Sequence, residues 1–363
     1  MARDRLISAA ALDRLLAILL AVVGATGLLT LRAGTPDAAW LFVFHGLLAG
    51  ALLAAIVLKL RGSLVRAVRA RRWSRLSVGL LVSAIALGSV VAGYAWAGSG
   101  TAWVVSLPWL GSITVLTLHV WLGLALVPIL AVHLIPKRWR LLRPRLVPPR
   151  ASGQGTAAGR GAAAADFRRP SFVSRRSVLL GLGFGGVATV ALGVANGLER
   201  LAGGVRRFTG SRLLPSGGVP PSTTFFGEAA PAFDPTAWRL SVAGHVGRPR
   251  TMSLDELRAL GETEVTATLD CTSGWALATS WRGVPLAAVL HAAGVASTAS
   301  TIEVRSLTGW GASFPIGDAS GLLLATGVAG GDLPFQNGAP VRLVAPNRRG
   351  LDWVKWVGEI TVS

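Results

Sequence analysis

The stretch Thr268-Leu-Asp-Cys-Thr-Ser-Gly-Trp-Ala-Leu-Ala-Thr-Ser-Trp-Arg-Gly-Val-Pro-Leu286 contains the only cysteine of the 363-residue chain. It follows an alternating apolar run that predicts a strand over Glu264–Leu269. A lone cysteine has no partner for an intrachain disulfide, so Cys271 is either a buried small hydrophobe or a thiolate kept for chemistry or for metal ligation. The residues around it favour metal ligation.

The last part of the chain, residues 205–363, is nearly balanced in charge and breaks into short alternating runs separated by Gly and Pro. This pattern predicts a mixed α+β domain that is large enough to bury its own core. The further strands expected are Trp238–Gly244, Thr301–Ser306, Pro340–Val344 and Val357–Val362, and the helices expected are Ser253–Leu260, with a capping box, and Pro285–Ala293.

The chain is too apolar for a wholly soluble protein, since its mean hydropathy is +0.55 and 52% of its residues are apolar, so part of it is expected to lie in a membrane. Apolar windows of about 18 residues or more, the length that crosses a bilayer, predict spanning helices. They indicate a four-helix transmembrane domain over 1–136, a basic linker over 137–176, and a fifth, anchoring helix over 177–198. The five windows are 15–31, 38–58, 76–97, 113–135 and 177–198.

The net charge of +19 at first suggests nucleic acid, but its distribution points to a membrane instead. Basic residues concentrate in 59–75 and 137–176, whereas the loops at 33–37 and 98–112 carry none. Basic clusters in alternate loops place those loops in the cytoplasm, in contact with anionic lipid headgroups. We therefore expect a multi-pass protein of the cell membrane that binds no nucleic acid and whose residues from about 205 onward are extracytoplasmic.

The segment Ser174-Arg-Arg-Ser-Val-Leu-Leu180 precedes the fifth expected span. A pair of arginines is typical of any cytoplasmic flank, but the segment also closely resembles a twin-arginine export signal in an internal position. That route exports folded proteins, often with a cofactor bound. Both interpretations run the fifth helix from inside to outside.

The residues around Cys271 form a spaced series that resembles a known family. The series continues with Trp275, Trp281-Arg-Gly-Val-Pro-Leu286, Gln336-Asn-Gly-Ala-Pro-Val-Arg-Leu343 and Val354-Lys-Trp-Val357. Over about Pro221 to Ser363 it is similar to the oxidoreductase molybdopterin-binding domain of sulfite oxidases and periplasmic methionine-sulfoxide reductases. The resemblance implies a sulfite-oxidase-like α+β fold and a molybdopterin-dependent oxidoreductase.

The resemblance also implies a role for each residue of a cofactor site. Cys271 would be the catalytic residue and the thiolate ligand of molybdenum, a soft ligand suited to such a metal. A pterin that ends in a phosphate needs cationic and amide partners. The cofactor contacts implied by the resemblance are Arg342, Lys355, Asn337 and Ser306, the main chains of Trp353 and Val354, and, at the N-terminal edge, Thr223, Phe226 and Gly227.

Histidines in the expected spans suggest a second cofactor. His45 and His119 lie at similar depth in the second and fourth spans, which are diagonal in an up-down four-helix bundle. Two imidazoles from facing helices can ligate one b-type haem, although hydrogen bonding to a neighbouring helix is the alternative. The sequence therefore predicts one haem near the outer side, in a domain that resembles a b-type cytochrome. His133 stays unassigned, and His245 and His291 are expected on the surface.

Three functions remain open from the sequence. The leading one is an oxidoreductase that transfers an oxygen atom from a small or protein-bound sulfoxide, with electrons from the quinol pool relayed through the membrane domain. A sulfite-type dehydrogenase that passes electrons to the membrane is the second, and a non-catalytic scaffold with a decayed cofactor site is the third. Ser273 and Gly274 stand where the reductase branch often has an acidic residue, so the sequence leaves the substrate undecided.

Overall fold

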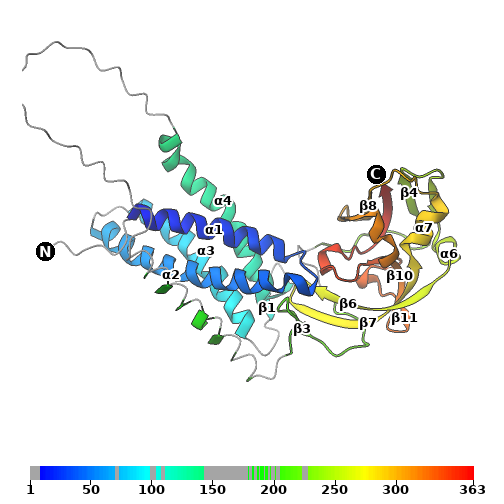
Figure 1. Cartoon of the computed structure of the whole chain (residues 1–363), viewed down its shortest axis with the longest axis horizontal. Helices are drawn as coiled ribbons and strands as arrows, with labels where there is room; N and C mark the ends of the chain where they lie inside the picture. Colours follow the sequence, from blue (N-terminus) through cyan, green and yellow to red (C-terminus); the bar gives the residue numbers. More distant parts are fainter. Residues whose placement is uncertain are drawn as a thin grey trace, which may run out of the picture.

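The computed structural model describes residues 9–69, 73–98, 104–107, 111–142, 205–222 and 228–363, with scattered positions between 179 and 201. Figure 1 shows an elongated helical bundle with a sheet-rich domain at one of its ends. The bundle consists of α1 (Ala9–Thr30), α2 (Ala39–Arg69), α3 (Trp73–Gly98) and α4 (Val115–Leu142). Helices that follow one another in the chain pack together, and α1 also contacts α4.

Three of these helices contain stretches long and apolar enough to cross a membrane: Ala11–Thr30, Pro36–Leu60 and Gly79–Gly98. The apolar stretch found in α4, Val115–Ile129, is shorter. The helix itself continues past Pro136 to Leu142, into the segment expected to be a linker. A proline removes one backbone donor and bends a helix, but transmembrane helices tolerate it because neighbouring groups satisfy the freed carbonyl.

The first two helices carry charged residues just outside the spans expected from the sequence. Asp13 of α1 and Lys59 of α2 form an ion pair. Each charge is thereby paired, as charges near apolar surroundings usually are. Of the fifth expected span, 177–198, only scattered positions are described, and each of them is helical.

The sheet-rich domain contains two sheets and confirms the expected α+β class. One sheet has the order β11-β10-β7-β3, with β6 paired to β7 and β12 paired to β10. The other has the order β5-β4-β13-β8-β9, in which β4 and β13 are parallel. The bounds of the strands are β3 Arg212–Leu213, β4 Leu240–Gly244, β5 Arg250–Met252, β6 Thr263–Cys271, β7 Trp275–Pro285, β8 Thr301–Ser306, β9 Gly311–Pro315, β10 Leu323–Val328, β11 Gly331–Asp332, β12 Arg342–Val344 and β13 Val357–Val362.

Short elements complete both parts. The helix expected at 253–260 is α6 (Leu254–Arg258), and Ser253 and Glu256 form the expected capping box. The helix expected at 285–293 is α7 (Leu286–Ala293), which ends at Gly294 in the left-handed conformation. A two-stranded hairpin, β1 (Val104–Leu107) with β2 (Gly111–Thr114), leads from α3 into α4.

Two central strands, β7 and β10, were not expected from the sequence. All six residues of β10 are buried, and most residues of β7 are buried on both faces. A strand covered on both faces has no alternation of polar and apolar residues to reveal it. Strand β6 pairs along its whole length with β7, and Cys271 lies opposite Trp275 at the end of that hairpin.

Candidate functional site

Cys271 lies at the tip of the β6–β7 hairpin, where the chain turns sharply. Its carbonyl accepts a hydrogen bond from the Gly274 N–H at 2.9 Å, and its Sγ accepts one from the Ser273 N–H at 3.4 Å. Gly274 has a φ of 96°, which L side chains rarely adopt, so a glycine closes this turn. The cysteine takes part in no disulfide and is partly buried. The hairpin therefore presents the cysteine from a rigid end of the sheet.

Two cationic side chains lie near this cysteine. Arg342, at the start of β12, is 4% exposed, and its Nη1 donates to the Asn337 carbonyl at 2.9 Å. Its guanidinium carbon lies 5.5 Å from the centre of the Trp281 ring and 5.8 Å from that of Trp353. The Nε of Arg342 is buried and has no hydrogen-bond partner among the described residues. A buried donor without a partner is costly, which points to a ligand that completes it.

The second cation is Lys355, whose Nζ donates to the Gln336 carbonyl at 3.0 Å. The pKa of Lys355 is lowered to about 8, first by burial and second by the charge of Arg342, whereas Cys271 and Glu228 act in the opposite direction. Burial likewise lowers the pKa of Arg342 to about 10, again opposed by Cys271 and Glu228. The site thus holds two poorly solvated cations close to one cysteine, an arrangement that favours an anionic ligand.

The other described residues expected at the site are buried and hold the fold locally. The Asn337 Nδ2 donates to the Pro220 carbonyl at 2.9 Å. The Ser306 hydroxyl accepts from the Thr308 N–H at 3.2 Å. The Trp353 N–H and the Val354 carbonyl each take part in a backbone hydrogen bond. Three expected contacts, Thr223, Phe226 and Gly227, lie outside the described residues.

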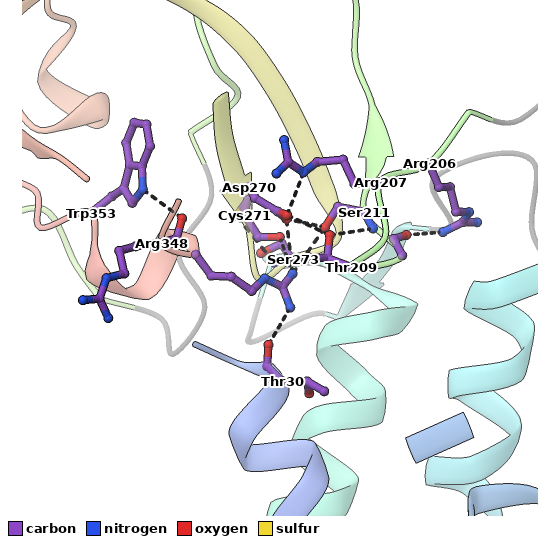
Figure 2. Close-up of polar contacts among 12 residues, drawn as sticks. Thr30, Arg206, Arg207, Thr209, Ser211, Asp270, Cys271, Ser273, Arg348 and Trp353 are labelled. Carbon is purple, nitrogen blue, oxygen red and sulfur yellow. Dashed lines mark hydrogen bonds and ion pairs between the residues drawn. The ribbon is translucent and has the colours of Figure 1, made fainter. Parts of the chain in front are cut away.

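A buried carboxylate beside the cysteine was missed by the sequence analysis. Asp270 is 1% exposed and accepts hydrogen bonds from Thr209 Oγ1 at 2.7 Å and Ser211 Oγ at 2.6 Å (Figure 2). It also pairs with Arg207 at 3.2 Å and Arg349 at 3.4 Å. The available signal was an acidic residue directly before the only cysteine, together with the arginine pairs at 206–207 and 348–349.

Arg349 extends this network to the cysteine and to the bundle. Its Nη2 donates to the Cys271 carbonyl at 3.2 Å, and its Nη1 donates to the Thr30 carbonyl at 3.1 Å. Thr30 ends α1, and the last carbonyls of a helix have no partner within it. One buried side chain therefore caps a helix of the bundle and fixes the backbone of Cys271.

The bundle also touches the turn after the cysteine. Thr114 Oγ1, where β2 meets α4, donates to the Ser273 carbonyl at 2.9 Å. Arg206 Nη2 donates to the carbonyl of Trp96 in α3 at 2.8 Å. The cysteine turn is thus part of the interface between the sheet domain and the bundle.

The expected histidine pair lies inside the bundle. The ring centres of His45 and His119 are 6.0 Å apart and the rings meet edge to face, which confirms that they face one another. His45 Nδ1 is 3.0 Å from Thr26 Oγ1, and His119 Nδ1 is 2.7 Å from the Ser89 carbonyl. The Nδ1 atoms are therefore engaged, so Nε2 of each ring is the nitrogen left for a further bond. The two histidines of the sheet domain, His245 and His291, are exposed as expected.

Replacing Asp270 by asparagine should destabilise the protein, because the buried Arg349 and the half-buried Arg207 would lose their counter-charge. Breaking a buried pair in this way costs about 3–5 kcal/mol, which corresponds to a fall on the order of 10 °C in the thermal midpoint. Glu303→Gln is the matched control, since its pair with Arg305 is partly exposed and is worth about 0–1 kcal/mol. Equal midpoints for the two variants in circular dichroism would contradict this role of Asp270.

Comparison with known proteins identifies the sheet domain. Residues 227–363 match the family described as oxidoreductase molybdopterin binding domain. The catalytic subunit MsrP of the protein-methionine-sulfoxide reductase of Xanthomonas campestris pv. campestris is 32% identical over 151 residues, 37% of this chain and 47% of that protein. Mitochondrial sulfite oxidase of Macaca fascicularis is 31% identical over 186 residues, 42% of this chain and 34% of that protein.

The chain thus aligns with less than half the length of these relatives. Among solved structures, the sulfane dehydrogenase SoxCD of Paracoccus pantotrophus shares 27% identity over 37% of this chain and 40% of that chain, with a TM-score of 0.35, too low to support an argument about the fold. Cys271, Arg342 and Lys355 all fall within the matched residues. Residues 227–363 are therefore a molybdopterin-binding oxidoreductase domain, related in sequence to methionine-sulfoxide reductase and to sulfite oxidase.

Proposed function

We propose that this chain is a membrane-anchored molybdenum-cofactor enzyme that reduces sulfoxides outside the cytoplasmic membrane. Electrons would reach it from quinol through the helical domain. The observation that carries the proposal is the position of the Cys271 thiol close to two cations, the buried Arg342 and the half-buried Lys355, within a molybdopterin-binding domain.

The residues present fit the cofactor. Cys271 would ligate molybdenum, while Arg342 and Lys355 would hold the phosphate of the pterin, and the unpaired Nε of Arg342 supplies a donor for it. When bound, the cofactor supplies two-electron oxygen-atom chemistry. The remaining contacts are proposed for Ser306, Asn337, Trp353, Val354, Thr223, Phe226 and Gly227.

The residues around Cys271 would hold this metal ligand in position and would take no part in the reaction itself. The Ser273 N–H donates to Sγ and so fixes the position of the sulfur that would ligate the metal. Arg349 fixes the Cys271 carbonyl and, by its own burial, keeps water from that side of the hairpin. A ligand held by such a supporting shell keeps its geometry through a redox cycle.

The substrate class rests on the relatives. A sulfoxide accepts two electrons and two protons and gives a thioether and water. The similarity to a methionine-sulfoxide reductase supports this direction, with the sulfoxide either free or in a protein. The comparable similarity to sulfite oxidase supports the alternative, a sulfite-type dehydrogenase that passes electrons to the membrane.

Membrane anchoring is supported by the surface of the bundle. Large apolar side chains such as Ile18, Leu29, Leu81 and Val91 are exposed on it, and an apolar surface of this kind suits lipid rather than water. Basic residues in alternate loops support the orientation in which residues 205–363 are extracytoplasmic. The division into a transmembrane domain over 1–136, a linker over 137–176 and an anchoring helix over 177–198 is part of this proposal.

One b-type haem between His45 and His119 would carry the electrons. The ring separation of 6.0 Å and the engaged Nδ1 atoms support bis-histidine ligation through Nε2. Thr26 and Ser89 would orient the rings, as hydrogen-bonding partners of metal-bound imidazoles do. The side chain of His133 lies outside the described residues and has no role in this proposal.

Metal content tests the central assignment. The purified wild-type chain should contain molybdenum in a ratio near one per chain, and Cys271→Ser should lose most of it together with sulfoxide reduction. Arg305→Ser, a partly exposed position away from the cysteine, is the control and should keep both. A wild type without molybdenum would support the scaffold hypothesis, and a Cys271→Ser protein that retains the metal would exclude the cysteine as its ligand.

The lowered pKa of Lys355 predicts a pH dependence of cofactor binding. Below about pH 8 this lysine is charged in the empty site, and above that pH it loses its proton. The affinity of the cofactor-free protein for metal-free molybdopterin should therefore fall as the pH rises through about 8, because the phosphate keeps its charge there. In Lys355→Arg the side chain stays charged and the fall should disappear. Fluorescence titration measures both, and a wild-type affinity that does not change over this range would contradict the role.

The haem assignment is tested by the reduced-minus-oxidised visible spectrum of the detergent-purified chain. A haem band is expected, and it should disappear in the His45→Ala and His119→Ala variants. His245→Ala and His291→Ala are matched controls that should keep the band, since both side chains are exposed in the sheet domain. Absence of the band in the wild type, or its persistence without His45 and His119, would rule out the ligand pair.

A further inference from the structure

Trp96 of α3 packs directly against the turn that follows Cys271. The side chain is 4% exposed. A Cβ added to Gly274 would come within 2.3 Å of Trp96 Cζ2 and 2.8 Å of Trp96 Cε2. The indole ring therefore touches the Gly274 backbone itself, and no side chain larger than a hydrogen atom fits between them.

The same face of α3 touches His119 one turn earlier. A Cβ added to Gly93 would lie 2.9 Å from His119 Nδ1. Residues three apart on a helix lie on one face and are about 4.5 Å apart along the axis. On successive turns, α3 thus contacts the ring of His119 and the turn of Cys271.

Hydrogen bonds connect the Gly274 turn to the sulfur of Cys271. The Gly274 N–H donates to the Cys271 carbonyl, and the N–H of the preceding residue, Ser273, donates to Sγ. The indole is held in place on the other side, because the Arg206 guanidinium carbon is 5.2 Å from the ring centre and its Nη2 donates to the Trp96 carbonyl. The contacts form a fixed, protein-filled connection from His119 to Cys271.

We propose that Trp96 is the positioning residue through which electrons pass between the haem side of the bundle and the Cys271 turn. This inference rests on the proposed function. The indole is neither oxidised nor reduced. Its packed atoms fill the space between α3 and the Cys271 turn, where water or a gap would weaken the electronic coupling between the two cofactors. With both cofactors bound, each sulfoxide would take up two electrons, passed singly across this contact, and two protons, and would give a thioether and water.

A competing connection starts at Thr114, which precedes His119 by five residues. Its hydroxyl donates a hydrogen bond to the Ser273 carbonyl. It involves one hydrogen bond and no ring packing. Thr114→Val removes that bond, together with those between Thr114 Oγ1 and Thr117 at the start of α4, and keeps the shape of the side chain. This variant therefore separates the hydrogen-bonded connection from the one through the indole.

The test follows the haem spectrum by stopped flow after reduced protein is mixed with methionine sulfoxide. In Trp96→Leu the haem should be reoxidised at least about ten-fold more slowly than in the wild type, with Trp96→Phe between them and Thr114→Val close to the wild type. Sulfoxide reduction by reduced viologen, which supplies molybdenum directly, should be unchanged. In a second arm, oxidised protein is mixed with sulfite, so that the same comparison holds if electrons flow towards the haem.

Glycine variants provide a matched pair for the contact itself. Gly274 and Gly309 both have positive φ, at 96° and 88°, so an alanine strains the backbone equally at each. Only at Gly274 does the new methyl group meet Trp96, because a Cβ at Gly309 has nothing within 4 Å. Gly274→Ala should slow haem reoxidation, and Gly309→Ala should leave it unchanged.

The outcomes separate the two proposals. A wild type with no haem band, or whose haem responds to neither substrate, contradicts the proposed function and the electron path with it. A wild type that transfers electrons while both Trp96 variants match its rate contradicts the path alone. A third outcome also excludes the path. In it, the Trp96 variants keep their haem and molybdenum, but viologen-driven sulfoxide reduction slows as much as haem reoxidation does. Trp96 would then contribute only to the stability of the fold.

Discussion

The buried carboxylate of Asp270 is the constraint on which the arrangement around Cys271 depends. A charge taken out of water is costly unless other groups compensate it, and here the compensation comes from separate segments of the chain. Thr209, Ser211 and Arg207 approach from the segment before β3, and Arg349 approaches from the loop before η4 (Gly350–Asp352). Since Arg349 also binds the end of α1, one carboxylate fixes the sheet domain, the 206–212 segment and the bundle relative to one another.

Because of this constraint, Cys271 lies near two cationic side chains and also next to the helical bundle. Arg342 and Lys355 give a poorly solvated positive charge suited to an anionic cofactor. The turn after the cysteine meets Trp96 and Thr114 of the helical part, where the histidine pair lies. Joining a metal site and an electron carrier in one chain raises their effective concentration, and the direct packing of the two parts removes the need for a docking step. The contacts that stabilise the fold would therefore also carry the proposed electron transfer.

The sequence revealed the features that depend on local pattern. The capping box at Ser253 and the strands with alternating residues were predictable, and the matching depth of His45 and His119 predicted that they face each other. Strands β7 and β10 were missed because both of their faces are buried. The partners of Asp270 were missed because they lie 59 to 79 residues away, and the contact of Thr114 with Ser273 spans 159 residues. No periodicity encodes contacts between such distant segments.

The most direct test of the account is whether one chain holds molybdenum and haem iron close together. Pulsed electron paramagnetic resonance of the Mo(V) signal measures this, because a nearby paramagnetic iron accelerates the spin relaxation of molybdenum. The account predicts faster relaxation when the haem is ferric than when it is ferrous and diamagnetic, in the purified wild-type chain. Equal relaxation in the two states, with both metals present, would contradict the direct connection between the bundle and the Cys271 site.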